Sequence, residues 1–170
     1  MEKNYRFARH DSVPPIIDSS CHTLLLGSML SPKSAEAEFY YAHPQNRFWT
    51  VLSAVFGFPT ALTKDARTSL ALSNGIALWD VIYSCEIVGA SDTTIKNVTY
   101  NDLVGLLDEY PNITRVFATG GKAYELLKKY NKRYNNPILN NAARLPSTSP
   151  LNCATKIEQL IKAYSVIKTE

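Results

Sequence analysis

The segment from Tyr40 to Trp49 brings together side chains that could bind a ligand and act on it. Four aromatic rings stand here with a histidine, an arginine and the carboxamide of Asn46. A core helix or strand would repeat its apolar residues with a period, whereas these rings and hydrogen-bonding groups are crowded around a proline. That composition is typical of a pocket for a flat ligand with polar edges.

Several other kinds of site are excluded by residue spacing. The three cysteines, Cys21, Cys85 and Cys153, form no Cys-x-x-Cys pair and cannot supply the four thiolates of an iron–sulfur cluster. His43 has no second histidine at ligand spacing, so we expect no zinc site and no other metal. The turn 27–32 contains neither Gly-x-Gly-x-x-Gly nor Gly-Lys-Ser/Thr, which excludes a dinucleotide fingerprint and a P-loop. We expect no cofactor.

Four polar residues also have plain structural interpretations. Asn46 stands just before a helical pattern, where Asn is a preferred N-cap. Asp80 would bond backbone amides at a strand end, and Asp92 would cap a turn. Cys85 has no histidine near it in sequence and is better explained as a small buried residue than as a nucleophile. Local sequence therefore leaves the role of Asn46 open.

The turn before the helix at Ala123 offers a possible phosphate contact. Backbone N–H groups at Gly121 and the ammonium of Lys122 could face a phosphate, although a tight turn is the simpler explanation. Five basic residues and one acid lie between Lys122 and Arg133, which would make either a phosphate-facing surface or a solvated helix face.

The overall composition permits nucleic-acid binding without requiring it. Lys and Arg number 18 against 15 Asp and Glu, a formal net charge of +3 over 170 residues. This length predicts a single domain, 1–170, with a polar leader over 1–20. There is no secretory signal pattern and no run of about 18 apolar residues. We expect a soluble, intracellular protein that does not enter a membrane.

Hydrophobic patterns predict an alternation of strands and helices. Continuous apolar runs predict strands over Thr23–Leu26, Ile76–Ile82 and Thr114–Ala118, with a weaker one between Ile138 and Leu145. Helical spacing predicts helices at about 35–40, from Asn46, over 63–72, after Asp102, over 123–134 and around Ile157–Tyr164. Residues 84–97 lack a period and are predicted to form an irregular loop.

This alternation, without a hairpin signal, favours an α/β fold with three α/β/α layers and a central, mainly parallel four-stranded sheet. Ligands bind such sheets outside the carboxyl ends of the strands. The segments that leave those ends are polar and rich in Gly, Ser and Pro, namely 27–32, 84–92, 119–122 and 146–152. We expect one edge of the sheet to collect most of the chemistry.

Three stretches resemble the uracil-DNA glycosylase superfamily: Gly27-Ser28, the run Tyr41–Trp49, and Leu145–Asn152. Within it the chain is most similar to the hypoxanthine-DNA (deoxyinosine) glycosylase branch. That branch shares the Tyr-Tyr-Ala-His-Pro-x-Asn-Arg-Phe-Trp run and a Gly-Ile-x-Leu-Trp-Asp-Val segment like Gly75–Val81. The likeness extends from about Leu24 to the last helix.

The resemblance assigns roles in a base pocket. Mismatch-specific and thymine-DNA glycosylases hold the attacking water on the Asn of Gly-Ile-Asn-Pro-Gly, where this chain has Met29, whose thioether is a weak acceptor. The resemblance implies that Asn46 takes over part of that role, as a catalytic residue that positions water or binds the base. It places Tyr41 under the extruded base, and Gly27, Ser28 and His43 around it.

The last motif implies contacts with the DNA duplex. Ser149-Pro150-Leu151 resembles the Ser-Pro-Leu wedge that enters the duplex where the base has left, and the wedge loop includes Ser147, Thr148 and Asn152. Uracil-specific enzymes carry a catalytic His in the motif His-Pro-Ser-Pro-Leu, where this chain has Ser147. That departure favours a protonatable purine such as hypoxanthine, with stabilisation of the leaving group by backbone amides.

The resemblance therefore predicts a base-excision repair glycosylase acting on DNA that contains deaminated bases, hypoxanthine first and uracil second. No lysine stands in these motifs to form a Schiff base, so we expect a monofunctional enzyme in which water is the nucleophile. We expect a monomer in the cytoplasm, associated with the nucleoid in a prokaryote. Two alternatives remain: a non-catalytic damaged-DNA-binding module, and a nucleotide- or nucleoside-processing α/β enzyme.

Overall fold

The structure is a computed structural model that describes residues 2–169. Its central element is a parallel sheet of four strands in the order β3-β2-β6-β7. The strands are β2 (Thr23–Gly27), β3 (Ile76–Asp80), β6 (Arg115–Thr119) and β7 (Ala143–Leu145). Every residue of β2 is buried, as its unbroken apolar run predicts for a central parallel strand. The predicted four-stranded parallel sheet is confirmed.

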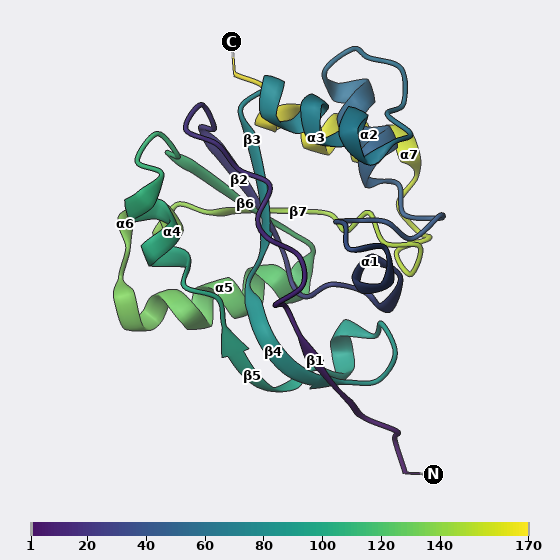
Figure 1. Ribbon diagram of the computed structural model, residues 1–170, viewed down its shortest axis with the longest axis vertical. Coiled ribbons are helices and arrows are strands. Elements are labelled where there is room, and N and C mark those ends of the chain that lie inside the picture. The colour runs from purple at the N-terminus through teal and green to yellow at the C-terminus, as the bar shows by residue number, and fades with distance from the viewer. Residues whose placement is uncertain (1, 170) are drawn as a thin grey trace.

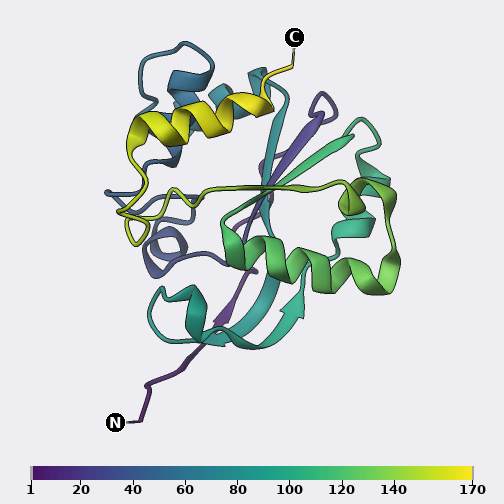
Figure 2. The same cartoon turned by 180° about the vertical axis from the view of Figure 1, so that it is seen from behind.

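Helices cover both faces of this sheet and give the three predicted layers (Figures 1 and 2). Successive residues of β2 point to opposite faces, so Leu25 joins one buried cluster while Leu24 and Leu26 join the other. The face of Leu25 is covered by α2 (Phe48–Val55), α3 (Lys64–Ser73) and α7 (Ile157–Tyr164). The opposite face is covered by α4 (Leu103–Glu109), α5 (Gly121–Tyr134) and α6 (Pro137–Asn140).

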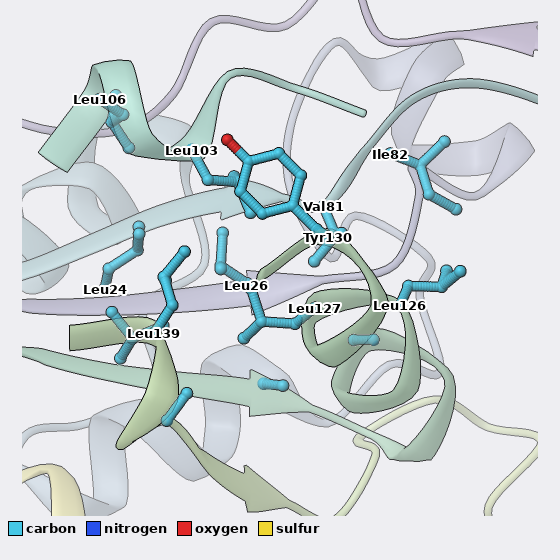
Figure 3. Packing of buried hydrophobic residues seen from close by; sticks show 14 of the residues in the cluster. Leu24, Leu26, Val81, Ile82, Leu103, Leu106, Leu126, Leu127, Tyr130 and Leu139 are labelled. Atoms are coloured by element: carbon cyan, nitrogen blue, oxygen red, sulfur yellow. The ribbon is translucent and has the colours of Figure 1, made fainter. Parts of the chain in front are cut away.

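The larger cluster packs helical side chains onto the strand that carries the first motif. Figure 3 shows Leu26 of β2 in this cluster with Leu103 of α4 and Leu127 of α5, all three with no solvent-exposed surface. Burying each such side chain contributes roughly 1.5–3 kcal/mol. The packing fixes the end of β2, and with it the start of the loop at Gly27.

A second sheet contradicts two expectations from the sequence. Three antiparallel strands, β1 (Arg6–Arg9), β4 (Ile82–Ile87) and β5 (Lys96–Tyr100), pair in the order β1-β4-β5. The predicted irregular loop over 84–97 is therefore wrong, and the polar leader 1–20 contains a strand (Figure 1). The β4–β5 pairing has register shifts, and its connection holds a 3₁₀ turn, η1 (Asp92–Thr94). Both features hide the alternation and the short turn that signal a hairpin.

Smaller differences between the predicted and observed elements occur at the ends of helices, where capping residues set the boundary. Helix α1 (Pro32–Ala37) begins earlier than predicted, because the Ser31 hydroxyl caps it and Pro32 suits its first turn. The predicted strand between Ile138 and Leu145 is helix α6 followed by the three-residue β7, because Asn136 accepts hydrogen bonds from two backbone N–H groups and starts a helical turn. Within residues 2–169, no helix is long and apolar enough to span a membrane.

Candidate active site

A cavity of about 480 Å³ opens at the carboxyl ends of the parallel strands. Gly27, Asp80 and Thr119 line it from the ends of β2, β3 and β6, and Ser147 lines it from the segment after β7. Its size lies within the range of roughly 300–1,000 Å³ for small-molecule pockets. The expectation that one edge of the sheet collects polar loop residues agrees with this arrangement.

Tyr41 forms one wall of the cavity. Its ring stacks on Phe48 with centroids 3.8 Å apart and planes 12° from parallel, and its hydroxyl hydrogen-bonds with the Thr119 hydroxyl at 3.0 Å. Burial raises the pKa of the Tyr41 phenol, which stays neutral. The backbone φ of 51° at Tyr41 is uncommon for a residue with a side chain, and such strain is found where the surroundings hold a functional group in place.

Gly27 allows a close approach between the first motif and β3. A Cβ atom at this position would lie 2.3 Å from Oδ1 of Asp80 and 3.3 Å from the Tyr41 hydroxyl. Any side chain at residue 27 would therefore displace the carboxylate or the ring that line the cavity.

Asn46 is held by two hydrogen bonds to the same atom. Its Oδ1 accepts from the Phe48 backbone N–H at 2.9 Å and from the Thr148 hydroxyl at 2.8 Å. The backbone N–H can only donate, which fixes the orientation of the amide, and the two bonds use both lone pairs of the oxygen. The NH₂ group is thus what Asn46 can offer to a ligand in the cavity. The sequence left open whether Asn46 caps a helix or lines a binding site. In the structure Asn46 does both, because it accepts the cap-like bond from the Phe48 N–H and also lines the cavity.

The loop 146–152 is tied to the same segment through Arg47. The Arg47 backbone N–H donates to the Thr148 carbonyl at 3.1 Å, and its guanidinium donates to the carbonyls of Asn152 and Thr155. Leu151 stands out from this loop with 70% of its surface exposed. Sequence reasoning missed Arg47. The sequence signal that could have found it is a positive charge at the start of a helix. The helix dipole disfavours a cation there, so Arg47 is expected to have another binding partner.

A buried ion pair lies behind the cavity. His10, just after β1, donates from Nε2 to Oδ2 of Asp80 at 2.8 Å, and its side chain has no exposed surface. Burial is the largest influence on the pKa of His10 and lowers it, but the hydrogen bond and charge of Asp80 outweigh burial and leave the pKa raised. The interpretation that the Asp80 carboxylate bonds backbone amides is wrong, because its hydrogen-bond partner within residues 2–169 is His10. Nothing local in the sequence indicated this pair.

Asp92 faces the cavity from the β4–β5 connection. The Ser28 hydroxyl donates to its Oδ1 at 2.9 Å. Burial raises the pKa of the Asp92 carboxyl, the bond from Ser28 lowers it, the charge of Asp80 raises it and that of Lys122 lowers it, with a net rise. Asp92 starts η1, but its carboxylate is directed to Ser28 and not to a turn amide, which the sequence did not predict.

Of the other predicted site residues, four line the cavity and four do not. Met29, Thr148, Ser149 and Asn152 line it with the residues described above. His43, Pro150, Gly121 and Lys122 lie outside its lining, and their predicted contacts with a base or phosphate stay predictions.

The residues outside the lining have other neighbours. His43 accepts at Nδ1 from the Gln45 backbone N–H at 3.1 Å, and the Lys122 ammonium lies 3.7 Å from Glu125. In the described part of the chain, no group of three His, Cys, Asp or Glu side chains is placed to hold a metal ion.

Known proteins resemble this chain in sequence and in fold. A hypoxanthine DNA glycosylase from Methanosarcina barkeri is 34% identical over 113 residues, 66% of this chain and 72% of the relative. A hypoxanthine DNA glycosylase from Methanosarcina acetivorans is 29% identical over the same shares. The solution structure of a candidate uracil DNA glycosylase from M. acetivorans has the same fold, with a TM-score of 0.77, 24% identity, and coverage of 95% of this chain and 98% of that one. No protein-family model matches the sequence.

Proposed function

The chain belongs to the hypoxanthine branch of the uracil-DNA glycosylase superfamily, and we propose that it removes hypoxanthine, and more slowly uracil, from DNA. In this proposal the damaged nucleotide flips out of the duplex and its N-glycosidic bond is hydrolysed to leave an abasic site. The relatives' names support a DNA glycosylase. The observation that carries the finer proposal is the cavity in which the flat ring of Tyr41 and the amide of Asn46 stand together.

The aromatic ring supplies part of the energy of base flipping. Stacking a base on such a ring contributes roughly 1–3 kcal/mol, against a few kcal/mol to unstack the base from the duplex. Phe48 stacks on the Tyr41 ring and holds the ring in position before a base binds, so binding does not have to order the ring. A mispaired deaminated base unstacks at lower cost than a paired one, so the balance favours damaged sites.

Asn46 suits recognition of the base more than activation of water. Its Oδ1 is occupied by Phe48 and Thr148, whereas its NH₂ group can donate to an acceptor on the base, such as O6 or N7 of hypoxanthine. A donor at these positions also stabilises the negative charge that develops on the base as the glycosidic bond breaks.

The chemistry requires water as the nucleophile. Among the described residues that line the cavity there is no lysine, so a Schiff base with the sugar has no candidate amine. The sugar develops oxocarbenium character, which DNA phosphates beside it would stabilise. The product of this monofunctional route is an abasic site.

Leu151 is placed to enter the duplex. Leu151 is exposed on a loop anchored by Arg47 and stands at the cavity, and apolar side chains in such positions can insert between base steps. We expect Leu151→Ala to slow cleavage of an inosine duplex by about tenfold, the factor for a loss of about 1.4 kcal/mol, and to change cleavage of single strands little. Single-turnover rates on both substrates would measure this. Equal losses on the two would argue against insertion.

An abasic-site assay tests the function. Labelled duplexes with inosine, uracil or xanthine, and an undamaged duplex as control, are incubated with the protein and treated with alkali. We expect strand breaks at inosine first. Tight binding to the inosine duplex without breaks would support the non-catalytic DNA-binding module, and cleavage of free nucleosides alone would support a nucleoside-processing enzyme. Either result would overturn the proposal.

A further inference from the structure

We propose that Asp92 is the catalytic base that holds and deprotonates the attacking water, and that Ser28 is its positioning residue. The inference rests on the proposed glycosylase function and assigns the one group which that function leaves open. Its support is geometric: a carboxylate in the cavity, bonded to the loop that follows β2.

The other groups near the sheet edge cannot take a proton from water. Met29 lines the cavity at the end of β2, but a thioether is at best a weak acceptor. The Asn46 Oδ1 already accepts two hydrogen bonds. The hydroxyls of Ser28 and Thr119 both donate, to Asp92 and to the Leu26 carbonyl. A carboxylate is therefore required, and the described lining contains two, Asp80 and Asp92.

Each of the two carboxylates accepts one side-chain hydrogen bond within residues 2–169, but Asp80 and Asp92 differ in partner and in exposure. Asp80 is buried, its Oδ2 accepts from His10, and its Oδ1 is so near Gly27 that a Cβ there would lie 2.3 Å away, whereas Asp92 is an exposed residue. Oδ1 of Asp92 accepts from Ser28, while its Oδ2 accepts no hydrogen bond from residues 2–169. Asp92 therefore has an oxygen free to accept from water, held in place by the bond to its other oxygen.

The surroundings of Asp92 raise the pKa of its carboxyl above the ordinary value and make it a better base than an unperturbed aspartate. Burial and the charge of Asp80 raise the pKa of its carboxyl, and the Ser28 hydroxyl and the Lys122 ammonium lower it, with a net rise. A base is most effective when its pKa approaches the working pH. Cys85 is near enough to feel the charge of Asp92, but its thiol is buried and neutral.

The step balances without a further reactant. Water forms a bond from its oxygen to C1′ as the bond from C1′ to N9 of hypoxanthine breaks. The electron pair of that bond leaves with the base, and one water proton moves to Oδ2 of Asp92. The base anion then takes up a proton from solvent, and Asp92 releases its proton to solvent.

The decisive variant is Asp92→Asn, which keeps the size and the acceptor for Ser28 but cannot take a proton. We expect its single-turnover release of hypoxanthine to fall about a hundredfold or more, the scale of losing general base catalysis. Binding to the inosine duplex, measured by fluorescence anisotropy, and the melting temperature should stay at wild-type values or rise. The matched control is Asp108→Asn, which removes the same charge from an exposed position on α4.

Two further readouts separate a catalytic base from a structural carboxylate. The wild-type rate should fall as the pH drops through the pKa of Asp92. This decline of the rate at low pH should disappear in Asp92→Asn. In Ser28→Ala it should move to higher pH, because the lost hydrogen bond from Ser28 had lowered the pKa of Asp92. In Asp92→Ala, azide, a nucleophile that needs no deprotonation, should restore hypoxanthine release at least tenfold and leave the wild type unchanged.

The outcomes separate this inference from the proposed function. If wild-type protein releases hypoxanthine and Asp92→Asn does so within threefold of its rate, the assignment of Asp92 is overturned and the glycosylase function stands. A loss of rate in Asp92→Ala that azide does not restore would also overturn the assignment. If wild-type protein releases no base from any substrate, the glycosylase function and the assignment of Asp92 are both overturned.

Discussion

Two walls of the cavity are built in different ways. The aromatic wall consists of Tyr41 and Asn46, with Phe48 stacked on the Tyr41 ring, and all three come from one continuous stretch of chain. The acidic wall, Ser28, Asp80 and Asp92, comes from three separate segments, with His10 behind it from a fourth. The aromatic wall is uncharged, its Tyr41 hydroxyl and its Asn46 Oδ1 are hydrogen-bonded, and the Asn46 NH₂ group has no partner within residues 2–169, so the groups that it offers to a ligand do not change with pH near neutrality. The acidic wall carries two carboxylates, the buried Asp80 paired with His10 and the more exposed Asp92, whose pKa is raised.

In the proposed mechanism, this difference separates recognition of the base from proton transfer. Rings and a carboxamide give shape and hydrogen bonds that do not depend on pH, whereas a buried carboxylate responds to each charge around it. Asp80 is compensated by His10 within 2.8 Å, but Asp92 has only the neutral Ser28 as a direct partner. We therefore expect changes in the aromatic wall to alter rate and binding without altering pH dependence, and changes at Ser28 or Asp92 to alter the pH dependence of the rate as well as the rate itself.

The largest expected effect tests the aromatic wall. Asn46→Ala should lower the single-turnover rate about a hundredfold or more, the scale of losing a positioned polar group in a catalytic site. The lost bond to the Phe48 N–H should also lower the free energy of unfolding by about 1 kcal/mol. The shape of the pH–rate profile should stay unchanged, since Asn46 does not titrate.

Thr148→Val is the matched control for Asn46, because it removes one donor to Oδ1 and keeps the bond to Phe48. We expect a smaller loss of rate in this variant. A lower stability of Asn46→Ala with a wild-type rate would leave Asn46 as a helix cap alone.

A smaller effect is expected from the stacking ring. Tyr41→Ala should weaken binding to an inosine duplex by about tenfold, which corresponds to the roughly 1–3 kcal/mol of a lost stacking contact. Tyr41→Phe keeps the ring and removes only the bond to the Thr119 hydroxyl, so its affinity should stay close to that of the wild type. Titration of fluorescent duplexes would measure both. Equal losses in the two variants would show that the hydroxyl and not the ring face matters.

The smallest expected effect is on the free energy of unfolding and tests the His10–Asp80 pair of the acidic wall. Because Asp80 leaves the pKa of His10 raised, the folded state holds the imidazole proton more tightly than the unfolded state. This stabilisation should be complete below a pH of about 6.5, the ordinary value for His, and should be lost as the pH rises through the folded pKa. Urea unfolding at pH 6, 7 and 8 would measure a shallow decline. His10→Gln should abolish it, and a parallel decline in that variant would assign it to other groups.

Local patterns predicted the parallel sheet and the aromatic wall. The run of β2 and the periods of α2, α5 and α7 mark elements whose burial follows from apolar spacing alone. The order of strands and helices then places Gly27 and Ser147 at one edge. The motif around Asn46 needs no tertiary information, because its rings and amide lie within a few residues of each other.

Long-range pairing decided the acidic wall. His10 is positioned by β1, in which Ala8 pairs with Cys85 and Arg9 with Ser84, and Asp92 by the β4–β5 connection. These strands are short and partly exposed, and the β4–β5 pairing has register shifts, so their sequences show no hydrophobic alternation from which they could be predicted. The interpretation of Asp80 and Asp92 as backbone-bonding residues failed because their partners, His10 and Ser28, lie about 70 and 64 residues away in the chain.

The amino-acid sequence by itself determined the α/β layers, the family motif and the ring and amide that line the cavity. Those features depend on spacing within single segments, where hydrophobic period and side-chain chemistry act locally. Only the tertiary structure decided which carboxylates face the cavity, that the side-chain oxygen of Asn46 is occupied, and which oxygen of Asp92 is free. Each of these depends on a hydrogen bond between segments that the fold, and not the local chain, brings within 3 Å.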